Sequence, residues 1–310
     1  MTIETIFQSR LLFVSGKGGV GKTSFASSLA LASSDKGKKG LLVEIDNIHP
    51  STTNIFGIKP EYNPTPISKN LSIANITWKE ALKSWLTETI KSRTIVQMIL
   101  GQPIAMIFLD ATPGAREIVI LAKLVSLLEE WDQIIVDLPA SGHALGILRV
   151  PKTAQNLMKK GPINEVSKKI LKIFSQDTTR VVLVSLPEEM VINETIEFAN
   201  KLHQQVPEVS KPIVVLNRMS IPTLSKDENT LLDRLKEKEI APPEANELIE
   251  AATWERDLEQ ASQRAAERLQ ATQRGKLISF QRLGILGGYD GGPQKVIQQM
   301  KAALLRMAVR

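Results

Sequence analysis

The sequence predicts an α/β fold in which a mostly parallel, twisted sheet is flanked by helices. Short apolar runs alternate along the 310 residues with longer stretches of helical periodicity, which is typical of parallel strands joined by crossover helices. A glycine-rich loop also lies between the apolar run Leu11–Val14 and the helical stretch Phe25–Ala32. Together these observations favour a single domain over residues 1–310.

Five apolar runs are expected to form the main strands, and two further runs are candidates for edge strands. The five are Leu11–Val14, Leu41–Ile45, Ile134–Val136, Val181–Ser185 and Ile213–Leu216, and the two candidates are Leu71–Ala74 and Leu283–Leu286. Ligands of open α/β sheets bind beyond the carboxyl ends of the strands. The residues that follow each strand are therefore the first candidates for a site.

Three segments interrupt the alternation and are interpreted as helical insertions, at about residues 60–102, 151–175 and 224–280. The first begins rich in proline, and the second, Pro151–Phe174, is basic and amphipathic. The third, Leu224–Phe280, is rich in Glu, Arg, Gln and Ala, which favours long charged helices.

Composition excludes several classes of protein. No run of about 18 apolar residues is present, and Met1–Glu4 lacks the features of a signal peptide, so a cytoplasmic location is expected. The absence of cysteine excludes disulfides and thiolate metal sites in this chain. The net charge of +6 favours acidic partners, but with only 5% aromatic residues we do not expect nucleic-acid binding.

The segment Ser15–Thr23 matches the phosphate-binding pattern Gly-x-x-x-x-Gly-Lys-[Ser/Thr]. Glycines let backbone N–H groups surround phosphate oxygens at a helix N-terminus. Lys22 is expected to reach the β- and γ-phosphates of ATP, and the hydroxyl of Thr23 is expected to bind Mg²⁺. The predicted nucleotide-binding residues are Gly16, Lys17, Gly18, Gly19, Val20, Gly21, Lys22, Thr23 and Ser24.

Lys17 is one lysine more than this pattern requires. A side chain at that point leaves the loop outward. It is therefore positioned to reach a phosphate across a dimer interface.

Asp137 closes the strand Ile134–Val136 and is expected to share the Mg²⁺ ion with Thr23, although it could instead cap the next helix. Gly142 would let the backbone approach the γ-phosphate and move when that phosphate leaves. His143 is interpreted as a hydrogen-bonding residue of the same moving loop.

Asp46 ends another apolar strand and is expected to face the γ-phosphate, where it would orient the attacking water or act as its base. The alternative is that Asp46 caps the following turn. Glu44 lies on the other side of the strand and is interpreted as structural. His49 follows in the same loop, and without softer ligands nearby neither His49 nor His143 predicts a metal site.

Asn217 and Arg218 follow the strand Ile213–Leu216 and would place an amide at the base end of the nucleotide. An amide offers both a donor and an acceptor, which matches the edge of adenine.

With these residues assembled, the chain resembles the ATPases with a deviant phosphate loop, and among them the arsenical-pump and guided-entry (tail-anchored protein targeting) ATPase family. Beyond the loop, the resemblance rests on further blocks spread over nearly the whole chain. These are Asp46–His49, Pro113–Glu117, Asp137–His143 with Ala144, Leu145 and Leu148, Leu186–Glu188 with Glu194 and Thr195, Asn217–Arg218, and the glycine-rich Gly287–Pro293.

The resemblance implies a dimeric ATPase that closes around two ATP molecules. Lys17 would then cross to the nucleotide of the partner, and Asp46 would position the hydrolytic water. Thr23 and Asp137 would serve Mg²⁺, and Asp46, His49, Asp137, Gly142 and His143 would form the two switches. Pro293 would belong to the adenine loop.

The chain also departs from the family pattern. Asn47 replaces the proline of the first switch, Asp-Pro-Ala-His. Without cysteine, neither a zinc-stapled dimer nor a thiolate arsenite site can form. The 151–175 segment is short beside the Met-rich insert of tail-anchor chaperones, so a full groove would need the other two insertions.

The leading hypothesis is a homodimer, or a heterodimer with a related ATPase, whose ATP state controls binding of a protein or hydrophobic client. One alternative is a positioning ATPase of the Min or Par type that contacts a membrane peripherally through the basic, amphipathic C-terminal helix Gln294–Arg310. Another is a regulatory ATP-binding subunit of a heterodimer.

Overall fold

The computed structural model describes residues 3–90, 92–220, 224–237, 243–273, 277–281 and 292–308. Within these residues, eight strands form one sheet in the spatial order β3-β4-β2-β5-β1-β6-β7-β8. Every neighbouring pair is parallel except β3 and β4. The strands are β1 (Leu11–Ser15), β2 (Gly40–Ile45), β3 (Thr65–Ser68), β4 (Leu71–Ile76), β5 (Gln133–Asp137), β6 (Thr179–Ser185), β7 (Ile213–Met219) and β8 (Ile278–Gln281).

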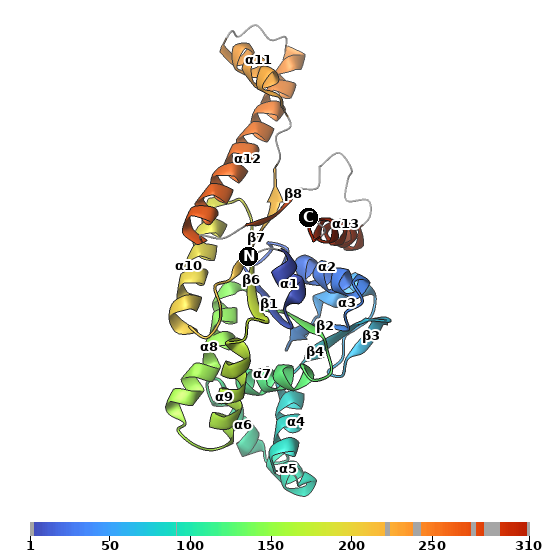
Figure 1. Cartoon of the computed structure of the whole chain (residues 1–310), viewed down its shortest axis with the longest axis vertical. Helices are drawn as coiled ribbons and strands as arrows, with labels where there is room; N and C mark the ends of the chain where they lie inside the picture. The colour runs from blue at the N-terminus through green and yellow to red at the C-terminus, as the bar shows by residue number, and fades with distance from the viewer. Residues whose placement is uncertain are drawn as a thin grey trace.

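Helices cover both faces of this sheet (Figure 1). They are α1 (Ile3–Gln8), α2 (Lys22–Asp35), α3 (Ser51–Phe56), α4 (Trp78–Ile90), α5 (Arg93–Leu100), α6 (Pro103–Ala111), α7 (Ala115–Leu127), α8 (Ser141–Leu157), α9 (Pro162–Phe174), α10 (Glu189–Gln205), α11 (Lys226–Glu237), α12 (Pro243–Gln273) and α13 (Gly292–Met307). The expected α/β fold and its five main strands are confirmed.

The two faces of the sheet have separate apolar cores because successive residues of a strand point to opposite faces. In β1, Leu11 and Phe13 pack with α4, α7, α8 and α9, whereas Leu12 and Val14 pack with α1, α2 and α13. Both cores are continuous across the central strands. The carboxyl ends of β2, β5 and β1 are thereby fixed side by side at one edge.

Strand β4 confirms the candidate Leu71–Ala74, but the 60–102 segment is helical only from Trp78 onward, because β3 and β4 occupy its first part. The 151–175 segment does not begin at Pro151, which lies inside α8. Proline removes a single hydrogen bond, and burial of its ring in the apolar core offsets that loss.

Within the described part of the 224–280 segment, α11 and α12 are helical as expected, but its last part is β8, which pairs with β7. A four-residue strand at the sheet edge carries too little pattern to be recognised beside a 31-residue helix. The candidate strand Leu283–Leu286 lies outside the described residues.

The C-terminal helix α13 buries its apolar stripe inside the protein. Ile297, Met300 and Leu304 are buried, and α13 packs along α2. Ser28 Oγ donates to the carbonyl of Ile297 at 3.1 Å, and Lys301 pairs with Asp35 at 2.9 Å. The stripe on which the membrane alternative depended is therefore covered.

Two helical regions extend to opposite ends of the molecule (Figure 1). Helices α11 and α12 form a long arm at one end, joined by an ion pair between Arg256 and Asp233 at 2.5 Å. Helices α4, α5, α6, α8 and α9 form the other end. Among the described residues, no helix combines the length and apolar character needed to cross a bilayer.

Candidate functional site

The loop between β1 and α2 has the backbone of a phosphate cradle. Gly16 and Gly21 have φ of +147° and +95°, values that favour glycine. A Cβ on Gly16 would lie 2.1 Å from the carbonyl oxygen of Val184, and one on Gly21 would lie 2.6 Å from Asn217 Nδ2. Helix α2 begins at Lys22, so the last lysine and threonine of the motif open the helix. The loop is therefore packed against β6 and β7 from behind.

Gly16 and Gly18 offer a matched test of this packing. Gly16→Ala is expected to lower the free energy of unfolding by about 2–4 kcal/mol, because the new methyl group overlaps the backbone of β6. Gly18→Ala meets nothing within 4 Å and is expected to change it by less than about 1 kcal/mol. Urea unfolding of both variants measures the difference, and equal effects would contradict the geometry.

Lys22 lies over the cradle. Its ammonium donates to the carbonyl of Lys17 at 3.0 Å. Burial lowers the pKa of Lys22, and the nearby carboxylates of Asp137 and Glu194 partly oppose that shift. Because burial leaves the ammonium of Lys22 poorly solvated, the negative charge of a polyphosphate would stabilise it.

Thr23 and Asp137 meet below the loop, as the sequence predicts. Thr23 Oγ1 donates to Asp137 Oδ2 at 2.5 Å, while Asp137 Oδ1 is buried with no hydrogen-bond partner. Burial raises the pKa of Asp137 to about 6, and the hydrogen bond from Thr23 opposes this rise.

A hydroxyl beside a buried carboxylate that has an unpartnered oxygen fits Mg²⁺, which takes hard oxygen ligands. Among the described residues no group of three or more His, Cys, Asp or Glu side chains could hold a metal ion.

The side chain of Lys17 extends toward α10. Its ammonium lies 3.6 Å from Glu194 Oε2. The other carboxylate oxygen of Glu194 accepts a hydrogen bond from Ser141 Oγ, and the backbone N–H of Ser141 donates to the carbonyl of Gly16 at 3.2 Å. The loop, the start of α8 and α10 are thus joined through Glu194.

Sequence reasoning assigned no role to Ser141 or Glu194. Glu194 appeared only within a family block, and the signal that could have found it is its place on the helix after β6, a strand that borders β1.

Asp46 lies just beyond β2 with an exposed side chain and a φ of +46°. Its carboxylate forms none of the hydrogen bonds or ion pairs found among the described residues, so it does not cap the following turn. Glu44 takes that position instead. It is buried and accepts from the N–H of Ser51 at 2.9 Å and from Thr52 Oγ1 at 2.7 Å, which confirms its structural role.

The remaining switch residues follow the same edge of the sheet, and none of the hydrogen bonds or ion pairs found among the described residues joins their side chains to the phosphate loop. His49 is exposed, and its N–H donates to Asn47 Oδ1 at 3.1 Å. Gly142 and His143 are exposed in the first turn of α8. No Cβ clash requires glycine at 142 in this conformation, so its role in a nucleotide-driven movement stays a prediction.

Asn217 is buried against the loop rather than presented to solvent. Its Nδ2 donates to the carbonyl of Val20 at 2.9 Å, and its Oδ1 accepts from the N–H of Arg218. A second donor and a second acceptor position remain, so the adenine contact stays a prediction. Arg218 is exposed with a φ of +57°.

Pro293 is the second residue of α13, and the neighbouring Gln294 donates to the carbonyls of Asn54 and Ile55. The structure shows no contact between Pro293 and Asn217. Residues 287–291 of the expected adenine loop lie outside the described residues.

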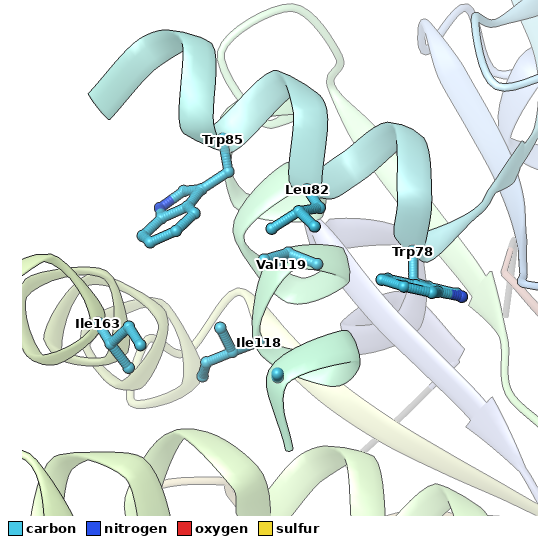
Figure 2. A pocket seen from close by; sticks show the side chains of 7 residues that line it. Trp78, Leu82, Trp85, Ile118, Val119 and Ile163 are labelled. Carbon is cyan, nitrogen blue, oxygen red and sulfur yellow. The ribbon is translucent and has the colours of Figure 1, made fainter. Parts of the chain in front are cut away.

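An apolar pocket lies in the helical end away from the arm. Figure 2 shows Trp85 and Leu82 of α4 directed toward Ile118 and Val119 of α7, with Ile163 of α9 across from them. Beside it, large apolar side chains are exposed on α5, α6 and the end of α8. These are Ile95, Met98, Ile104, Ile107, Leu157 and Met158.

The comparisons with known proteins cover the phosphate loop and the residues that follow β2 and β5. The family model described as anion-transporting ATPase matches residues 9–176, more than half of the chain. A relative from Aquifex aeolicus, named as an arsenical pump-driving ATPase, is 34% identical over 157 residues, which are 48% of this chain and 52% of that protein. ATPase BagA of Mycobacterium tuberculosis is 28% identical over 224 residues, 67% of this chain and 65% of BagA.

An ATPase ASNA1 homolog of Entamoeba histolytica is 29% identical over 173 residues, 51% of this chain and 52% of the homolog. The chain thus spans about half to two thirds of the length of these curated relatives.

Proposed function

Because the chain belongs to the anion-transporting ATPase family, we propose that it hydrolyses ATP as a pair of subunits and uses the nucleotide state to control binding of an apolar protein client. The observation that carries the proposal is the Thr23–Asp137 pair directly below a glycine cradle opened by Lys22. This combination of hydroxyl, carboxylate and lysine is built for a magnesium-bound triphosphate.

In the proposed reaction, backbone N–H groups of the loop and the Lys22 ammonium hold the β- and γ-phosphates. Thr23 and Asp137 would hold Mg²⁺, which would supply positive charge to neutralise the charge that develops on the phosphates. Asp46 accepts a proton from the attacking water at its exposed carboxylate. Its position past β2, two strands from β1 in the sheet order, supports this assignment.

We assign to Lys17 the contact with the nucleotide of the second subunit. In the single chain this lysine is about one third exposed and pairs only loosely with Glu194, at 3.6 Å. Exposed pairs of this kind contribute less than about 1 kcal/mol, so a phosphate of a partner subunit would readily replace Glu194. Lys17 would then complete the charge balance at the partner's γ-phosphate.

The client surface is assigned to the pocket of α4, α7 and α9 together with the exposed apolar side chains of α5 and α6. Patches of exposed Ile and Met on neighbouring helices mark binding surfaces in proteins of this size. Ile104 is 80% exposed and Ile107 is 66% exposed.

A fluorescent, helical peptide of about 20 apolar residues tests the client surface in the same samples that are assayed for ATP turnover. Replacing Ile104 and Ile107 together with serine is expected to weaken peptide binding about tenfold, because two buried contacts are lost. Leu248→Ser, which removes a 73% exposed leucine from the arm, is the control.

The assignment fails if both variants bind equally well, or if peptide affinity is the same with ADP and a non-hydrolysable ATP analogue. A wild-type chain that binds ATP without turnover would favour the regulatory subunit of a heterodimer instead.

A further inference from the structure

The first switch is held by the end of β4 as well as by hydrogen bonds within its own loop. The N–H of Asp46 donates to the carbonyl of Ile76 at 3.0 Å. The next residue, Asn47, is held at both backbone groups by one side chain. Its N–H donates to Asn75 Oδ1 at 3.1 Å, and its carbonyl accepts from Asn75 Nδ2 at 2.7 Å.

This pairing depends on a departure of the chain from its family pattern. The switch of the family has proline where this chain has Asn47, and proline has no N–H to donate. Asn75 is buried, and its own N–H donates to the carbonyl of Glu61 at 2.7 Å. Its side chain is therefore fixed at β4, with both ends of the amide directed to the backbone of the switch.

Asn75 also lies three residues before α4. That helix begins at Trp78, and Trp78, Leu82 and Trp85 line the apolar pocket (Figure 2). The ring of Trp78 lies 5.0 Å from the guanidinium carbon of Arg116 on α7. One buried amide thus joins the loop of Asp46 to the end of β4, the strand that leads directly into the helix forming one wall of the pocket.

We propose that Asn75 is a positioning residue: it holds the backbone at Asp46 and Asn47 in the geometry needed for hydrolysis and transmits movement of this switch to α4. The inference rests on the proposed function and deepens it, because it names the contact through which the nucleotide state reaches the client pocket. Asp46 has a strained φ of +46°, and a non-glycine residue keeps such a backbone where its surroundings hold it. The two hydrogen bonds between Asn75 and Asn47 help to hold the backbone at this point.

Asn75→Ala tests the proposal because it is expected to affect kcat and the KM for ATP differently. It is expected to lower kcat about tenfold or more while KM for ATP changes less than about twofold, because the phosphate loop is untouched and only the placement of Asp46 is lost. Asn70→Ala is the matched control. It removes an amide from the β3–β4 turn, at the opposite end of β4 from Asn75, where Asn70 Nδ2 donates to the carbonyl of Ser34 at 3.4 Å.

The second readout is tryptophan emission in a Trp131→Phe, Trp254→Phe background, which leaves Trp78 and Trp85 as reporters of the pocket. A non-hydrolysable ATP analogue is expected to change this emission in the parent and in Asn70→Ala, and the change is expected to be at least halved in Asn75→Ala. If Asn75→Ala does not fold, Asn75→Ser is used, because its hydroxyl cannot hold both backbone groups of Asn47.

A lowered melting temperature with unchanged kcat and unchanged emission response would overturn the proposal and leave Asn75 a structural residue only. The emission response needs binding and no turnover, so it separates the two claims. A wild type that responds without hydrolysing ATP would contradict the proposed function and leave the link through Asn75 supported.

Discussion

Replacing Lys17 with alanine is expected to leave ATP binding within about threefold of wild type and to lower kcat about 10²–10³-fold. The affinity is preserved because Lys22 and the loop backbone hold the phosphates of each subunit in the proposed dimer, while Lys17 pairs with Glu194 of α10. The turnover is lost because, in the proposed dimer, the Lys17 ammonium neutralises charge at the γ-phosphate of the partner. Steady-state turnover and titration with a fluorescent ATP analogue give the two quantities.

Lys201→Ala is the control for this prediction. Lys201 also pairs with a glutamate of α10, Glu197, at 2.5 Å, but it lies two turns beyond Glu194 and away from the loop. Its replacement removes an equivalent surface pair without touching the site. Equal turnover in Lys17→Ala and Lys201→Ala would refute the role given to Lys17, and a parallel loss of affinity and turnover would place Lys17 in its own subunit's site.

Asp46→Asn is expected to bind ATP normally and to lower kcat about 10²–10⁴-fold, because the amide keeps the size of the carboxylate but cannot accept the proton of water. The variant should accumulate in the ATP-bound state. Asp35→Asn is the control. It removes the carboxylate that pairs with Lys301 at the C-terminal end of α2, and it is expected to leave ATP binding and turnover unchanged. Single-turnover hydrolysis in excess enzyme measures the chemical step directly. Unchanged turnover in Asp46→Asn would remove Asp46 from the mechanism.

Local patterns were sufficient to predict the centre of the fold. Each of the main strands is a run of apolar residues buried on both faces, so β1, β2, β5, β6 and β7 stand out against the polar helices around them. The phosphate loop is read from glycine and lysine spacing, and Asp137 from its place at the end of a strand. These features depend on neighbours in sequence.

The contacts that connect the site depend on distant residues and could not be predicted. Glu194 reaches Lys17 only because β6 lies beside β1, and Asn75 reaches Asn47 only because β4 lies beside β2. A single polar residue on a helix or strand gives no sign of such a partner. For Asn217, the sequence predicted its place after β7 but not the contact of its side chain with the phosphate loop, where Nδ2 donates to the carbonyl of Val20.

The central claim is that two subunits close around ATP through Lys17, and the mass of the Asp46→Asn protein in solution tests it most directly. Analytical ultracentrifugation is predicted to show a dimer with ATP and Mg²⁺ and a smaller fraction of dimer with ADP. Adding Lys17→Ala to Asp46→Asn is predicted to abolish this gain. A mass that does not respond to the nucleotide, or a dimer that persists in the double variant, would contradict the claim.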